Sequence, residues 1–162
     1  MRKILLFAAF IFAAFPAFAK NLALPAKNPI ATISVPDKWK MQEIAYGYSA
    51  MSPDGDIFFS AEYATGDKGV ERMMKNNTQW MKENKITATS APKEDRIVVG
   101  DIECKIMRIE GKDKNGPTIV DFLFMPAGKD RLIMLTIWGS EKERAANQKD
   151  IDAIEASLKL IN

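Results

Sequence analysis

The sequence contains no histidine among its 162 residues and a single cysteine, Cys104. Histidine is the general base of Ser-His-Asp triads and Cys-His dyads and a common metal ligand, so sites of these kinds are excluded. One cysteine alone cannot form an internal disulfide or a structural zinc site. We therefore expect no catalytic, cofactor-binding or metal-binding residues of these classes, and no cofactor.

An excess of charge of one sign is also lacking. The sequence has 23 Lys and Arg residues against 21 Asp and Glu, a net charge of +2. Two of the basic residues, Arg2 and Lys3, lie in the N-terminal segment, so the rest of the chain is close to neutral. Because nucleic acids and anionic membrane surfaces recruit clustered positive charge, neither is an expected partner.

The first 19 residues have the pattern of a secretory signal peptide. A basic start is followed by the apolar run Ile4–Phe15, and Ala17 and Ala19 place small residues where a signal peptidase cleaves. The run is well short of the ~20 residues needed to span a bilayer. We expect cleavage after Ala19, a mature chain that begins at Lys20 without a membrane span, and a periplasmic location.

After the signal segment, residues 20–29 carry two prolines and predict an extended lead-in, and residues 30–162 predict a single domain. Apolar residues at helical spacing predict a helix near 68–84, with Asp67 as its N-cap. Ser140 and Glu143 form a capping-box pattern before a second helix, 141–160. Alternation and turn signals predict strands over 30–35, 43–51, 56–64, 96–99, 102–111, 118–125 and 131–138.

The strands 118–125 and 131–138 are apolar on both faces, apart from Asp121. Both faces therefore need cover, while the short turns between strands require antiparallel pairing. An antiparallel sheet with a helix on each face meets both conditions. The sequence thus predicts an α+β fold, a three-layer α/β/α sandwich.

Three segments resemble the PsbP-like family, which includes small bacterial periplasmic, DcrB-like members. "TISVPDKWK" resembles the opening strand and Pro-x-x-Trp turn of these domains, "SPDGDIFFSAEYA" their second hairpin, and "IDAIEASLKLI" their closing helix. The order of hairpins, helix, sheet and final helix is similar over nearly the whole mature chain. The resemblance implies the same sandwich and accessory or binding work; it assigns no functional residue.

Motifs that could carry chemistry are incomplete. "GYSAM" around Ser49 lacks the final glycine of the G-x-S-x-G nucleophile elbow, and the sequence has no histidine to act as its base. Ser90 and Lys93 match the S-x-x-K motif, but Pro92 between them disfavours the helix that this motif needs. Asp54 and Asp56 lack the further oxygen ligands of a calcium loop and predict a turn. Cys104 alternates with Ile102 and Ile106 on one strand face, which predicts an inert thiol in the core.

Aromatic residues with polar tips gather near one turn, and they are enriched in binding surfaces. We therefore expect Trp39, Tyr46 and Tyr48 to form a partner-binding surface. The expected function is a non-catalytic periplasmic accessory or binding protein for an unknown protein or envelope component. One alternative is a small-molecule binder with an apolar cleft between sheet and helix. The other is a hydrolase that uses carboxylates alone, from Asp54, Asp56, Glu62 and Asp121.

Overall fold

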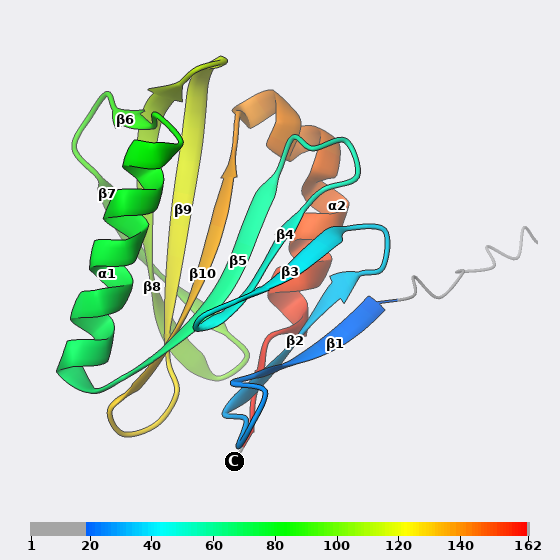
Figure 1. Ribbon diagram of the computed structural model, residues 1–162, viewed down its shortest axis with the longest axis vertical. Helices are drawn as coiled ribbons and strands as arrows, with labels where there is room; N and C mark the ends of the chain where they lie inside the picture. The colour runs from blue at the N-terminus through cyan, green and yellow to red at the C-terminus, as the bar shows by residue number, and fades with distance from the viewer. Residues whose placement is uncertain (1–18, 162) are drawn as a thin grey trace, which may run out of the picture.

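A large antiparallel sheet forms the centre of the computed structural model, which describes residues 19–161 (Figure 1). Its strand order is β3-β4-β5-β10-β9-β8-β6, and β7 pairs with β8. The strands are β3 (Lys40–Ile44), β4 (Gly47–Met51), β5 (Phe58–Thr65), β6 (Thr87–Ala88), β7 (Lys93–Val99), β8 (Ile102–Asp113), β9 (Gly116–Pro126) and β10 (Arg131–Gly139).

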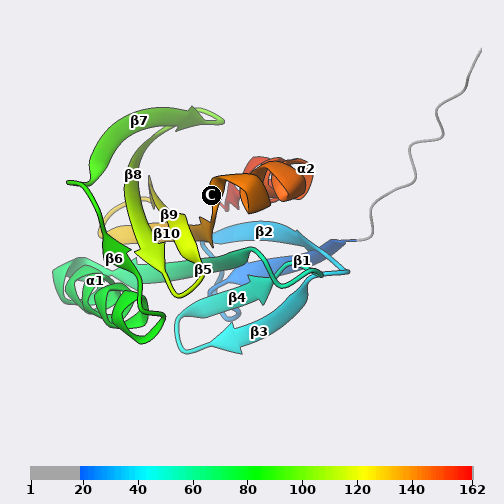
Figure 2. The ribbon, with the colours of Figure 1, turned by 90° about the horizontal axis from the view of Figure 1, so that it is seen from above.

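Two helices cover opposite faces of this sheet. Figure 2 shows α1 (Gly66–Glu83) on one side of β5, β10 and β9, and α2 (Glu141–Ser157) on the other. Under α1 lies a core that includes Met73, Val120 and Met134, while Ile151 and Ile154 of α2 join the core of the opposite face. The predicted antiparallel sheet with a helix on each face is confirmed.

A smaller sheet lies beside α2 and was not predicted. It has the order β1-β2-β11, from β1 (Ala19–Leu24), β2 (Ala31–Pro36) and β11 (Lys159–Leu160). The expected lead-in 20–29 therefore contains most of a paired strand, and Leu22 and Leu24 belong to the core. Residues 1–18 of the expected signal segment lie outside the described residues, and cleavage after Ala19 stays a prediction.

Three local predictions need correction. The expected strand 43–51 is a hairpin of β3 and β4 whose turn is Ala45–Tyr46, and Tyr63 N–H donates to the Tyr46 carbonyl at 3.0 Å. Thr65, not Asp67, is the N-cap of α1, and its side chain makes no capping bond. The second helix ends at Ser157 because the chain then pairs with β2 as β11.

The start of α2 agrees with the sequence. The Ser140 amide donates to the Glu143 carboxylate at 2.6 Å, and the Glu143 amide donates to the Ser140 hydroxyl at 3.3 Å. The predicted capping box is therefore confirmed. Neither helix of the described residues is long and apolar enough to cross a lipid bilayer.

Candidate functional site

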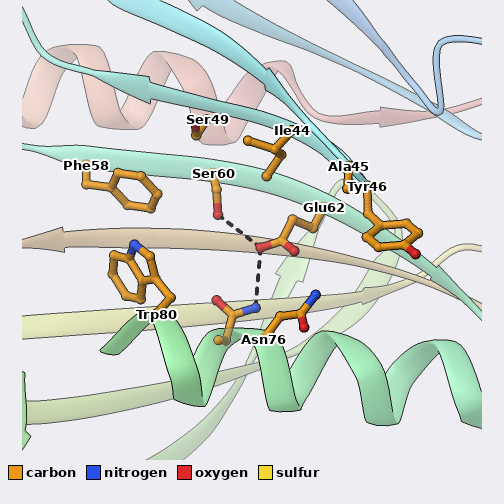
Figure 3. Close-up of a pocket in the computed structure, with 10 residues that line it drawn as sticks. Ile44, Ala45, Tyr46, Ser49, Phe58, Ser60, Glu62, Asn76 and Trp80 are labelled. Atoms are coloured by element: carbon orange, nitrogen blue, oxygen red, sulfur yellow. Dashed lines mark hydrogen bonds between the residues drawn. The ribbon is translucent and has the colours of Figure 1, made fainter. Parts of the chain in front are cut away.

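A pocket of about 270 Å³ opens between α1 and the end of the sheet formed by β3, β4 and β5 (Figure 3). We call it the α1–β5 pocket. It combines aromatic walls with a small group of polar side chains, which is the usual composition of a ligand site. Its lining residues are Ile44, Ala45, Tyr46, Ser49, Phe58, Ser60, Glu62, Asn76, Asn77 and Trp80.

The alternation of β5 explains the polar floor of the pocket. Side chains two residues apart point to the same face of a strand. Phe58, Ser60 and Glu62 therefore share the face that α1 covers, while the core of the opposite face contains Phe59 and Ala61. Two polar residues of β5, Ser60 and Glu62, thus lie beneath α1, on the sheet face that also carries the buried Thr136 of β10.

The facing helix brings a third polar residue and an aromatic wall. Asn77 is buried among the apolar residues of α1, and its amide donates to the Met73 carbonyl one turn earlier at 3.0 Å. Trp80 follows on the same helix face and stacks on Phe58, with ring centroids 4.8 Å apart. The stacked pair closes one end of the pocket.

Glu62 is the central chemical feature of the pocket. It is 8% exposed, and its Oε1 accepts hydrogen bonds from Asn77 Nδ2 at 3.3 Å and Ser60 Oγ at 3.4 Å. Burial raises the pKa of the Glu62 carboxyl above its usual value, against the lowering effects of these two bonds and of the Arg72 charge. Both bonds are long, so the protein satisfies this carboxylate only weakly.

Arg72 of α1 does not pair with Glu62, since no salt bridge within residues 19–161 includes this carboxylate. Its guanidinium lies over the Tyr46 ring instead, with the central carbon 3.5 Å from the ring centroid. That distance is typical of a cation–π contact. Tyr46 also meets the Tyr63 ring edge-on at 6.2 Å. These two contacts hold the turn of the β3–β4 hairpin in place, and this turn forms the other end of the pocket.

The three aromatic residues predicted as one partner surface are separated. Trp39 is 2% exposed, and its indole N–H donates to Asp150 Oδ2 at 3.0 Å, so it joins α2 to the core instead of forming a surface. Tyr46 is half-buried and lines the α1–β5 pocket. Tyr48 is also half-buried but packs toward the core of the opposite sheet face.

Of the four carboxylates considered for hydrolysis, only Glu62 lies in the α1–β5 pocket. Asp54 and Asp56 are on the exposed turn before β5, where Asp54 accepts hydrogen bonds from the Ser52 hydroxyl and from Asn147. Asp121 faces α2, on the other side of the sheet, and is paired with Arg108 and Arg144. The four groups are therefore not gathered at one site.

Cys104 lies in the core. It is fully buried, and its thiol makes only a weak contact with the Ile102 carbonyl, at 3.5 Å. Burial raises the pKa of the Cys104 thiol. A buried, protonated thiol is a poor nucleophile, which agrees with the core role predicted from its strand position.

Comparison with known proteins identifies the fold. No protein-family model matches the sequence, and no curated protein sequence matches it. The solved structure of PsbP from Synechocystis sp. PCC 6803 (CyanoP) matches with a TM-score of 0.60 and 8% identity, over 92% of this chain and 96% of that chain. The chain has a PsbP-like fold.

Two further solved structures resemble this chain in fold. LpqN of Mycobacterium tuberculosis, described as involved in cell envelope biogenesis, matches with a TM-score of 0.54 and 11% identity over 93% of this chain and 88% of its own. A protein of Bacteroides thetaiotaomicron matches with a TM-score of 0.55 and 11% identity; the likeness covers 82% of this chain and only 45% of that chain. At these identities the likeness shows the fold alone.

Proposed function

We propose that this protein is a non-catalytic binding protein that acts outside the cytoplasm and holds a small molecule in the α1–β5 pocket. The observation that carries the proposal is Glu62, a buried carboxylate beside an aromatic wall, without a cation paired to it in the described residues. Buried charges in proteins are normally paired. A buried charge that lowers stability and lies in a pocket is typical of a functional site.

The isolation of Glu62 favours binding over hydrolysis. Hydrolysis of glycosides by carboxylates uses two such groups, roughly 5–10 Å apart across the scissile bond. Asp121 lies on the opposite face of the sheet, and Asp54 and Asp56 lie on an exposed turn. Glu62 alone can hold and orient a ligand, but it has no second carboxylate from this set to complete a reaction.

The proposed location rests on two observations. The first 19 residues have the pattern of a secretory signal, and the PsbP-like fold is shared with LpqN, a protein described as involved in cell envelope biogenesis. A protein or envelope partner was the leading expectation from the sequence. That expectation depended on an aromatic surface that included Trp39, and Trp39 is buried. The α1–β5 pocket supports the small-molecule alternative instead.

The proposal is tested by filling the pocket. Ser49 lines it from β4, and Ser49→Phe would place a ring in the space between the sheet and α1. Thr78→Phe is the matched control, because Thr78 lies on the exposed side of α1 and does not line the pocket. Each protein is incubated with a small-molecule extract of the cell envelope, washed, and analysed for retained compounds by native mass spectrometry.

We expect the wild-type protein and Thr78→Phe to retain the same compound, and Ser49→Phe to lose it while remaining folded by circular dichroism. Retention of that compound by Ser49→Phe would place the binding elsewhere. No retained compound in any of the three proteins would contradict small-molecule binding.

A further inference from the structure

We infer that the occupant of the α1–β5 pocket is a small organic monocation, in which an ammonium group is joined to a short apolar body. This inference rests on the proposed function and specifies the chemistry of its ligand. It follows from the free oxygen of Glu62, the nature of the walls, and the position of Arg72.

The hydrogen bonding of Glu62 indicates the charge of the ligand. Figure 3 shows both of its hydrogen bonds meeting at one carboxylate oxygen. Among residues 19–161 no hydrogen bond reaches the other oxygen, Oε2. In its ionised form the carboxylate only accepts hydrogen bonds, so a ligand that binds Oε2 must supply a donor. A charged donor forms the stronger bond and also neutralises the buried charge.

The lining and the volume of the pocket indicate a ligand with a short apolar body. Phe58 and Trp80 close one end with apolar ring surface, and Ile44 adds an aliphatic wall. A cation is attracted to aromatic faces, and an apolar body gains from contact with them. The volume of about 270 Å³ is at the lower limit of pockets for drug-sized ligands, about 300–1,000 Å³. The ligand is therefore small.

The balance of charge around the pocket also favours a cation. Glu62 is the only charged residue among those that line it; the other polar lining residues are Tyr46, Ser49, Ser60, Asn76 and Asn77. Arg72 lies against the outer end, over the Tyr46 ring. An anionic ligand would meet a buried negative charge that no salt bridge in the described residues compensates, whereas a cation would complete the pair.

The test uses three probes that each join one phenyl ring to a polar group through a two-carbon chain: phenethylamine, 2-phenylethanol and 3-phenylpropionate, which are cationic, neutral and anionic at pH 7. The readout is the indole N–H resonance of Trp80 in titrations followed by nuclear magnetic resonance, assigned with Trp80→Phe. The chain has only three tryptophans, so this resonance is easily resolved. The variants are Glu62→Gln and, as a charge-matched control on the exposed side of α1, Glu71→Gln.

In the wild-type protein and in Glu71→Gln we expect the amine to bind at least about tenfold more tightly than the alcohol, and the propionate to bind weakest. In Glu62→Gln the amine and the alcohol should bind with similar affinity, because the charge is gone while the walls remain. Equal affinities for amine and alcohol in the wild-type protein would overturn the inference and leave the proposed pocket function standing. A preference for the amine that survives in Glu62→Gln would also overturn it. If none of the probes moves the Trp80 resonance, the inference is overturned, while the proposed function is decided by the comparison of the wild-type protein with Ser49→Phe.

Discussion

The two buried carboxylates of the sheet, Asp121 and Glu62, should respond in opposite ways to loss of charge. Asp121 binds Arg108 through two hydrogen bonds, Nε to Oδ1 at 2.8 Å and Nη2 to Oδ2 at 2.7 Å, and Arg144 also donates to Oδ2. Glu62 has only neutral donors, at 3.3 and 3.4 Å. We therefore predict that Asp121→Asn destabilises the protein at pH 7 and that Glu62→Gln stabilises it.

The expected loss for Asp121→Asn follows from the burial of its partners. Removing one member of a buried ion pair costs about 3–5 kcal/mol, because the other charge is left uncompensated. The Arg144 side chain is 13% exposed and fits this case, whereas the Arg108 side chain is 44% exposed and is partly screened by solvent. We expect a net loss of about 2–4 kcal/mol. At about 2–4 °C per kcal/mol, the melting temperature should fall by roughly 5–15 °C.

The expected gain in stability for Glu62→Gln follows from the raised pKa of the Glu62 carboxyl. The folded state favours the protonated Glu62 carboxyl, because the pKa of this group is higher in the folded state than in the unfolded state. The contribution of Glu62 to the free energy of unfolding is therefore fully present below the unfolded pKa, near 4.3, and is lost as the pH rises through the folded pKa. At pH 7 the wild-type protein carries this penalty, while glutamine remains neutral and can still accept the Asn77 hydrogen bond. The variant should therefore be more stable at pH 7, and the difference should vanish below about pH 4.

The assay is urea unfolding followed by tryptophan fluorescence at pH 7 and pH 4, with Glu71→Gln as the exposed control. Each variant is compared with the wild-type protein at the same pH, so that titration of other carboxylates cancels. The reasoning is refuted if Asp121→Asn stays within about 0.5 kcal/mol of wild type, the usual range of surface substitutions. It is also refuted if Glu62→Gln destabilises at pH 7 as much as Asp121→Asn does.

Three further predictions concern other parts of the chain. Cys104 should react with thiol reagents only after denaturation, and Cys104→Ser should cost about 1–3 kcal/mol in urea unfolding because it buries a poorly paired hydroxyl; rapid labelling of the native protein would show that the thiol is accessible. Gly47→Ala should cost about 2–4 kcal/mol, since φ is +152° and the new Cβ would lie 1.9 Å from the Ala61 carbonyl oxygen. Gly55→Ala, with no atom within 4 Å of its Cβ, should cost less, and equal losses would contradict the steric argument. The intact mass of the secreted protein should correspond to a chain that begins at Lys20, and a mass that retains the first 19 residues would contradict the predicted cleavage.

The layers of the fold could be predicted because their signals lie within single elements. Strands β9 and β10 are apolar on both faces, which requires cover on both sides, and the capping box marks the start of α2. The β3–β4 hairpin was missed because its turn, Ala45–Tyr46, lacks the Asn-Gly or Asp-Gly signal of two-residue turns. The small sheet was missed because β11 has only two residues and pairs with a strand more than a hundred positions earlier.

The parts of the candidate site were visible in the sequence, but their proximity was not. Tyr46 was assigned to a partner surface and Glu62 to a possible hydrolase, while Asn77 and Trp80 fall within the helix predicted near 68–84 and received no functional role. A usable signal existed: Glu62 and Asn77 are polar residues at positions whose spacing predicts burial, and buried polar groups usually find a partner. Deciding that these two residues meet required the position of α1 along β5, which no local pattern specifies.

The environment of Arg72 is the strongest argument that Glu62 serves a ligand and not the fold. Asp121 shows that this protein can satisfy a buried carboxylate with arginine, as it does with Arg108 and Arg144. Arg72 is close enough to Glu62 to lower its pKa, yet its guanidinium lies over the Tyr46 ring. A structural carboxylate would be more stable with that cation, and an apolar residue would avoid the desolvation altogether. Instead, one oxygen of the Glu62 carboxylate accepts no hydrogen bond from the described residues, and the carboxylate lies beside an aromatic wall. A cationic ligand would bind this oxygen and contact the wall.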